Sequence, residues 1–255
     1  MKEAKTIAIA NQKGGVGKTT TAVNVAAALE KLDKEVLLID SGPQGDATFN
    51  LGLGESMSKT LDNLYYDNIP IEDVIVQRGG IDVIGGSQPL EFAGIKLHDV
   101  SGKFTILSNK LSPVKDQYDF IIIDCPPNLR ILTINAIAAA DELVVIVEPE
   151  IYALKGLKRI TKNAKSIKDK WNPKLGEPAY LITKFDGRKK QHASAMGSVR
   201  RTFKDQVFNT KIRTNSTLSN CISKGKTVFE FDAKSYGAID HLNLAKEMVD
   251  RYGRG

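Results

Sequence analysis

The chain alternates short apolar runs with segments of helical periodicity. The apolar runs predict strands over 6–10, 36–40, 81–86, 118–127, 142–147 and 179–183. The periodic segments predict helices over 22–32, 60–66, 71–76, 131–140, 153–169, 191–205 and 237–252. Runs that are apolar at every position are typical of parallel strands covered by helices on both faces. The sequence therefore predicts an α/β fold, a doubly wound, mostly parallel sheet with helices on both faces.

The composition fits one globular domain over residues 1–255. Of the 255 residues, 42% are hydrophobic and 26% are charged, which excludes a chain that is disordered throughout. The sequence holds no internal repeat and no low-complexity linker. Its formal net charge of +6 is moderately basic and compatible with a polyanionic partner.

The two cysteines and the absence of long apolar runs indicate a cytoplasmic protein. Cys125 and Cys221 stand far apart and lack the spacing of a zinc site, so we expect reduced thiols. No apolar run approaches the roughly 18 residues that a membrane span needs. The N-terminus is predicted to start a strand rather than a signal peptide.

A glycine-rich loop, Asn11–Thr20, lies between the first predicted strand and the first predicted helix. Glycines allow successive backbone N–H groups to converge, and a helix N-terminus adds partial positive charge, which together favour a bound triphosphate. We expect Lys18 to reach the terminal phosphates and the Thr19 hydroxyl to bind Mg²⁺. The predicted nucleotide-binding residues of the loop are Lys13, Gly14, Gly15, Val16, Gly17, Lys18, Thr19 and Thr20.

Two aspartates follow apolar runs that are predicted to end at the same edge of the sheet. Asp124 comes directly after 120–123 and has the setting of a Walker B carboxylate that holds the hydration shell of Mg²⁺. Asp40 ends the run 36–40 and is the second candidate. The predicted metal site therefore consists of Thr19, Asp40 and Asp124.

The glycine loop departs from the general P-loop pattern, because Gln12 stands where the first glycine belongs. Its form, K-G-G-x-G-K-T-T, resembles the deviant Walker A loop of the ParA/MinD/nitrogenase iron protein class. The resemblance implies that Lys13 crosses a dimer interface to the partner's nucleotide, so that ATP binding drives dimerisation. It also implies catalytic roles for Lys13, Lys18 and Asp40. The alternative is a glycine-rich turn with incidental lysines.

The wider chain resembles the ParA partition ATPases, also called Soj. The resemblance rests on IDSGPQGDAT at 39–48, YDFIIIDCPPNL at 118–129, INAIAAADELVVIVEPE at 134–150 and LSNCISKGKTVFEFDAKSYGAIDHL at 218–242. It implies an ATPase that uses ATP and Mg²⁺, dimerises on ATP, binds DNA nonspecifically and segregates plasmid or chromosomal DNA with a ParB-like partner. We therefore expect it to be associated with the nucleoid.

One departure from the family bears on hydrolysis. The family's switch loop reads D-x-D-P-Q-G-N, whereas this chain has Asp40, Ser41 and Gly42, and so lacks the second aspartate. Loss of a group that activates or orients the attacking water typically costs about 10² to 10⁴ in rate. We expect nucleotide binding with slow hydrolysis, unless Asp46 or a partner supplies the missing function.

By the same resemblance, Thr183 and Lys184 end the strand that contacts the base, and Ile212–Asn215 corresponds to the family's I-P-R-N. Arg213 and Asn215 are accordingly predicted to bind nucleotide. Arg213 replaces the proline, and its guanidinium either stacks on the base or lies at the surface.

The last third of the chain is predicted to carry the DNA-binding surface, because cations gather there. The residues assigned to DNA are Arg188, Lys189, Lys190, Arg200, Arg201 and Lys224. Two other functions stay open: a MinD-like membrane-associated regulator and a non-hydrolysing ATP-dependent scaffold. The tail 247–255 is short and contains acidic residues, unlike the basic amphipathic helix that membrane binding needs, so we expect no membrane partner.

Overall fold

One eight-stranded sheet organises the molecule. The structure is a computed structural model that describes residues 3–67, 69–150 and 153–253. The strand order is β3-β4-β2-β5-β1-β6-β7-β8. All neighbouring strands run parallel except β3 and β4, which are antiparallel. The strands are β1 (Lys5–Ala10), β2 (Val36–Asp40), β3 (Ile75–Arg78), β4 (Ile81–Ile84), β5 (Phe120–Asp124), β6 (Glu142–Val147), β7 (Ala179–Phe185) and β8 (Val207–Arg213).

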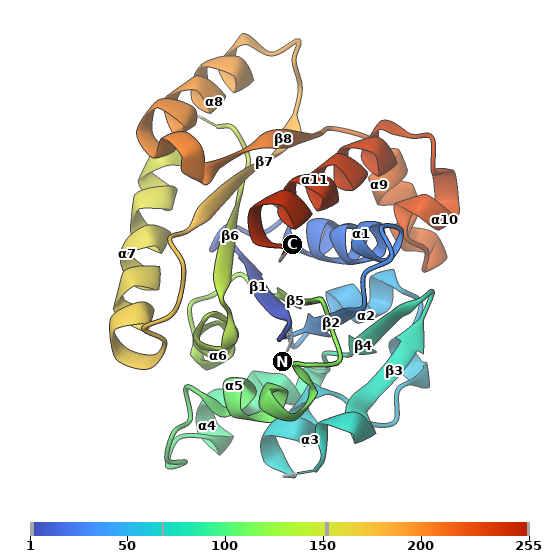
Figure 1. Ribbon diagram of the computed structural model, residues 1–255, viewed down its shortest axis with the longest axis vertical. Coiled ribbons are helices and arrows are strands. Elements are labelled where there is room, and N and C mark those ends of the chain that lie inside the picture. Colours follow the sequence, from blue (N-terminus) through green and yellow to red (C-terminus); the bar gives the residue numbers. More distant parts are fainter. Residues whose placement is uncertain (1–2, 68, 151–152, 254–255) are drawn as a thin grey trace.

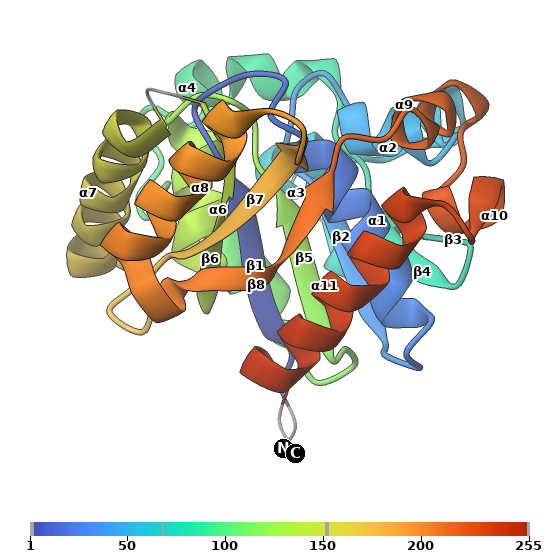
Figure 2. The same ribbon diagram turned by 90° about the horizontal axis from the view of Figure 1, so that it is seen from above.

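Helices cover both faces of the sheet (Figures 1 and 2). They are α1 (Lys18–Glu30), α2 (Asp46–Asn50), α3 (Leu61–Tyr66), α4 (Ala93–Lys96), α5 (Ile106–Leu111), α6 (Ile131–Ala139), α7 (Ala153–Trp171), α8 (Lys190–Phe203), α9 (Thr217–Asn220), α10 (Val228–Asp232) and α11 (Tyr236–Tyr252). The predicted doubly wound fold is confirmed.

Each buried strand supplies two cores, because successive side chains point to opposite faces. In β5, Ile121 and Ile123 pack in the core beneath α3, α5, α6, α7 and α8. Phe120 and Ile122 pack in the second core, beneath α1 and α11. A strand with helices on both sides therefore has to be apolar throughout, which explains the continuous apolar runs.

Two edge strands depart from the prediction. The segment 71–76 was expected to be a helix, but its helical turn ends at Val74 and the next residues enter β3. Gly79 and Gly80, with φ of 61° and 82°, turn the chain from β3 into β4. A Gly-Gly pair with positive φ is typical of a tight hairpin. Strand β8 was not predicted, because its polar positions are partly exposed at the sheet edge and hide the apolar pattern.

The register of the central strands brings the predicted site residues together. Asp40 at the end of β2 lies opposite Asp124 at the end of β5. Asp124 in turn lies opposite Ile9, one residue before the end of β1, from which the glycine loop departs. The carboxyl ends of parallel strands are where α/β proteins bind ligands.

Candidate nucleotide-binding site

The glycine loop curls at the end of β1 because two of its glycines adopt left-handed backbone conformations. Gly15 has φ of 70°, and Gly17, which precedes α1, has φ of 95°. Residues other than glycine rarely adopt these backbone angles. Thr21 then donates its backbone N–H to the carbonyl of Gly17, which starts the hydrogen bonding of α1. The loop thus leads directly into a helix N-terminus, which favours a bound anion.

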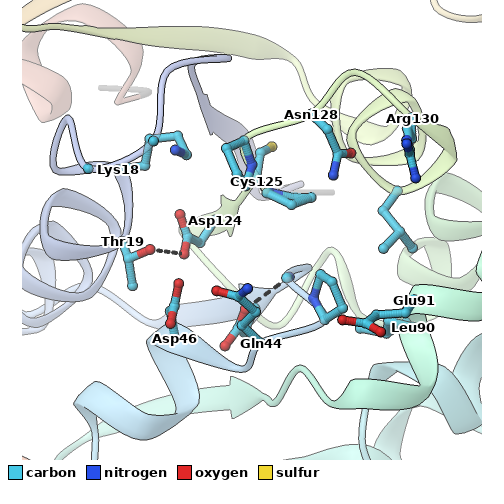
Figure 3. A pocket seen from close by; sticks show the side chains of 18 of the residues that line it. Lys18, Thr19, Gln44, Asp46, Leu90, Glu91, Asp124, Cys125, Asn128 and Arg130 are labelled. Carbon is cyan, nitrogen blue, oxygen red and sulfur yellow. Dashed lines mark hydrogen bonds between the residues drawn. The ribbon is translucent and has the colours of Figure 1, made fainter.

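Lys18 places a buried cation in this loop. Its Nζ donates to the backbone carbonyl of Lys13 at 3.3 Å, and the side chain borders the cavity shown in Figure 3. Burial lowers the pKa of Lys18, whereas the nearby charge of Asp124 raises it. A phosphate in the cavity would stabilise the protonated ammonium further.

Thr19 and Asp124 meet across the floor of the cavity. The Thr19 hydroxyl donates to Oδ2 of Asp124 at 2.7 Å (Figure 3). The other oxygen, Oδ1, is buried and has no hydrogen-bond partner among the described residues. Burial, together with the charge of Asp40, raises the pKa of Asp124. A buried carboxylate oxygen without a partner beside a hydroxyl fits a hydrated Mg²⁺, which takes oxygen ligands.

These protein groups do not form a metal cage by themselves. Within the described part of the chain, no group of three or more His, Cys, Asp or Glu side chains could hold a metal ion. Mg²⁺ in nucleotide sites normally takes one or two protein oxygens and completes its shell with phosphate and water. Thr19 and Asp124 therefore fit a metal that arrives with a nucleotide.

Asp40 anchors the loop that follows β2. Its buried carboxylate accepts hydrogen bonds from the N–H of Thr48 at 2.9 Å, the Thr48 hydroxyl at 2.8 Å and the N–H of Gly42 at 3.0 Å. Burial raises the pKa of Asp40, and these hydrogen bonds oppose the rise. Three of the roughly four acceptor sites of the Asp40 carboxylate are thus used within the loop, and the predicted direct contact of Asp40 with a metal stays a prediction.

The same loop has no carboxylate at position 42, where the family's switch loop has its second aspartate. A Cβ at Gly42 would lie 3.2 Å from Oδ1 of Asp40, so a larger residue needs a small shift of the loop. The carboxylate of Asp46, the first residue of α2, borders the cavity and faces Thr19 and Asp124 in Figure 3. Asp46 is thus the next acidic side chain of this loop at the site.

Lys13 is held within its own chain. Its Nζ lies 2.9 Å from Glu148 and 2.8 Å from Glu150, in the segment between β6 and α7. The hydrogen bond with Glu150 is the main cause that raises the pKa of Lys13. Sequence reasoning assigned no role to either glutamate, because the segment brings them to Lys13 only in the folded sheet.

The cavity at this site has a volume of about 1020 Å³. Of the site residues predicted from the sequence, those that line this cavity are Gly14, Gly15, Gly17, Lys18, Thr19, Thr20, Asp40, Asp124 and Lys184. Val16 is buried, and its carbonyl accepts a hydrogen bond from the Thr183 hydroxyl at 2.8 Å. Thr183 therefore holds the glycine loop against β7. Leu90 and Arg130 form part of a facing wall that the sequence did not reveal (Figure 3).

Arg213 and Asn215 are not among the residues that line this cavity. The Arg213 guanidinium donates to both carboxylate oxygens of Asp240 at 2.6 to 3.1 Å and lies 4.0 Å above the ring of Tyr236. The side chain of Asn215 accepts the N–H of Thr217 at 2.8 Å. The Arg213 guanidinium thus stacks on Tyr236 and pairs with Asp240, and its predicted contact with the base stays a prediction.

Five of the six residues assigned to DNA lie on or next to α8. Lys189 and Lys190 are exposed, and Arg188 is exposed but pairs with Asp186 at 2.9 Å. Arg200 donates to the carbonyl of Asn209 at 3.1 Å, and Arg201 to the hydroxyl of Ser198 at 3.1 Å. Lys224 follows α9, which lies away from α8 in Figure 1.

The fold and this site define a P-loop nucleotide-binding protein of the α/β class. A model of the AAA domain family matches residues 4–176. Soj, the sporulation initiation inhibitor protein of Bacillus subtilis, is 39% identical over 248 residues, which cover 96% of this chain and 98% of Soj. ParA, the chromosome partitioning protein of Myxococcus xanthus, is 38% identical over 248 residues. The match covers 96% of this chain and 88% of that ParA.

A solved structure shares the whole fold. Cobyrinic acid a,c-diamide synthase from Mycobacterium smegmatis, with bound ATP analog and magnesium, matches with a TM-score of 0.86 at 27% identity. The match covers 98% of this chain and 97% of that chain. The chain described here belongs to the ParA/Soj family of ATPases. In the described ranges, no helix has both the length and the apolar character needed to cross a bilayer.

Proposed function

We propose that this chain is a partition ATPase that binds ATP with Mg²⁺, dimerises on ATP and binds DNA nonspecifically. In this proposal the whole chain acts as one domain, in the cytoplasm and on the nucleoid, and moves plasmid or chromosomal DNA with a ParB-like partner. The observation that carries the proposal is the convergence of Lys18, Thr19 and Asp124 on one cavity. Its chemistry suits a magnesium-bound polyphosphate.

The residues of the glycine loop bind and orient the triphosphate in this proposal. Backbone amides of the loop and the Lys18 ammonium would bind the phosphates, while Thr19 and Asp124 would hold the metal, which would neutralise charge on the transferred phosphoryl group. The Mycobacterium smegmatis protein, at 27% identity, was solved with an ATP analog and magnesium, which supports the proposal that this fold binds ATP with magnesium.

Lys13 supplies the link between ATP and dimerisation. Its half-exposed side chain lies at the mouth of the loop, held by glutamates that are themselves accessible to solvent. A lysine inserted across a dry interface would stabilise charge that develops on the partner's nucleotide. Lys13 must then exchange Glu148 and Glu150 for phosphate, a stronger and more highly charged acceptor.

Hydrolysis is slow in this proposal because Gly42 has no carboxylate to orient the attacking water. The chain then remains in its ATP-bound form for longer than a family member with aspartate at this position. If no turnover occurs even with DNA and a ParB-like partner, the protein acts as a scaffold rather than as a slow motor. A turnover assay with both additions decides between these two behaviours.

Gel filtration of the full chain with ATP, ADP or no nucleotide, each with and without duplex DNA, tests the proposal. We expect a dimer with ATP and Mg²⁺, a monomer otherwise, and co-elution with DNA for the ATP form. Lys18→Ala is the matched control, because it removes the phosphate contact without altering the basic surface. A monomer under all conditions, or ATP-independent dimers, would contradict the proposal.

A further inference from the structure

Helix α7 has one apolar and one basic face. Its apolar face packs into the core through Leu157, Ile160, Ala164 and Ile167. Its opposite face is exposed and carries Lys155, Lys158, Arg159, Lys162 and Lys165. These cations recur at intervals of three or four residues, so they follow one side of the helix over about 15 Å. We refer to these five cations as the α7 stripe.

Helix α7 carries a large local excess of positive charge. Residues 153–171 contain seven lysines and arginines and one acidic residue, Asp169, for a formal charge of +6. The whole chain also has a net charge of +6, from 36 basic and 30 acidic residues. The remaining 29 basic and 29 acidic residues cancel in number, so α7 carries a local excess of six positive charges.

The α7 stripe has no acidic partners within the described part of the chain. No ion pair involves any of its five cations, whereas other cations of the protein are paired, such as Arg78 with Glu230 and Arg213 with Asp240. Like charges three or four residues apart destabilise a helix rather than stabilise it. A stripe of like charges that forms no ion pair with the described residues suits an external polyanion.

We propose that the α7 stripe binds the phosphate backbone of duplex DNA without reading its sequence. The inference rests on the proposed DNA binding. It locates that binding on α7, which contains none of the six residues assigned to DNA from the sequence. Helix α8, which begins with the exposed Lys190, lies beside α7 in Figure 1 and extends the basic surface. Backbone cations of this kind provide affinity that depends steeply on salt.

The geometry favours duplex DNA over other anionic surfaces. A membrane-binding helix needs a free apolar face, but the apolar face of α7 is buried against the sheet. A single-stranded nucleic acid is normally held by stacking on exposed aromatic rings. The stripe contains none, and Trp171 at the end of α7 packs against Phe104 instead. A rigid row of cations without rings matches a rigid phosphate backbone.

The test compares two full-length variants with the same loss of charge. The first is Lys155→Gln/Lys158→Gln/Lys162→Gln in the α7 stripe. The control is Lys31→Gln/Lys234→Gln/Lys246→Gln, at exposed positions outside α7 and outside the nucleotide site. Binding to a 30-base-pair duplex is measured with ATP and Mg²⁺ at several salt concentrations. ATP turnover without DNA and thermal stability are recorded for each variant.

We expect the α7 variant to lose most of its affinity at moderate salt. The slope of log affinity against log salt should become shallower by about 2.7, since each lost phosphate contact contributes about 0.9. Basal ATP turnover should be unchanged, and the control variant should bind DNA as the unmodified protein does.

The remaining outcomes separate the two claims. If the unmodified protein binds DNA and the α7 variant keeps the affinity and slope of the control, the stripe is not the DNA surface, while the proposed function survives. If the unmodified protein binds no DNA even at low salt, the proposed DNA binding fails, and this inference fails with it. Binding to polyglutamate but not to duplex would indicate an acidic protein partner and likewise overturn the assignment to DNA.

Discussion

Gly42 is the residue that sets the expected rate of hydrolysis. The carboxylate of Asp40 accepts the N–H of Gly42, and no side chain at position 42 reaches the cavity. The loop therefore keeps its shape through Asp40 while it lacks the group that would orient water. Asp46 faces the same cavity from the start of α2 (Figure 3).

We predict that Gly42→Asp raises ATP turnover by about 10²-fold or more, because it restores a water-orienting carboxylate. Its Cβ needs only a small adjustment of Asp40, so ATP affinity should change little. Steady-state phosphate release, with and without DNA, measures the effect. Unchanged turnover would show that Gly42 does not limit hydrolysis. Gly42→Asn, similar in size but uncharged, is the matched control and should remain slow.

Among the elements, the segment between β6 and α7 has the clearest regulatory consequence. Glu148 and Glu150 pair with Lys13 within the chain, so the proposed dimer, in which Lys13 crosses to the partner, has to break both ion pairs. We predict that Glu148→Gln/Glu150→Gln lowers the protein concentration needed for ATP-dependent dimers severalfold. Sedimentation with ATP and Mg²⁺ measures this concentration. Weaker dimers in the variant would mean that the two glutamates stabilise the dimer instead of competing with it for Lys13.

Helix α11 carries a buried histidine whose protonation opposes folding. His241 is fully buried, its Nδ1 lies 2.7 Å from the carbonyl of Gly237, and burial lowers its pKa to about 4. The unfolded chain binds a proton near the usual pKa of about 6.5, so the folded state loses stability as pH falls from about 6.5 to about 4. Urea unfolding should detect a loss of up to about 3 kcal/mol over this range.

His241→Leu should flatten that pH dependence, because it removes the titrating imidazole and fills its buried site with an apolar side chain of similar size. The comparison needs unfolding curves of both proteins at pH 7 and pH 5. An equal loss of stability in both proteins would assign the pH dependence to other groups.

The elements that the sequence predicted best are those buried on both faces. The apolar run of β5 and its terminal Asp124 followed directly from the pattern, because a strand covered on both sides has to be apolar. Edge elements are harder to predict, since exposed edges carry polar residues: the predicted helix 71–76 includes the first two residues of β3, and the pattern does not predict β8. The pairing of Lys13 with Glu150 depends on strand order, which the local pattern does not encode.

The whole molecule separates its two proposed activities in space. The nucleotide cavity lies at the carboxyl ends of the central strands, whereas α7, whose basic face is exposed, lies at one side of the molecule (Figure 2). The position of the nucleotide cavity was predictable from the sequence, because the carboxyl ends of the strands in a parallel sheet meet at one edge. The basic composition of 153–171 is visible in the sequence, but the exposure of its five cations on one face follows only from the burial of the opposite face of α7.

The central claim is that ATP bound at this cavity releases Lys13 to a second copy of the chain. Light scattering of the unmodified protein and of Lys13→Ala, each with ATP and Mg²⁺ at the same concentration, tests it most directly. We predict twice the monomer mass for the unmodified protein and the monomer mass for Lys13→Ala, with ATP retained by both. Dimers of equal strength in both proteins would contradict the claim.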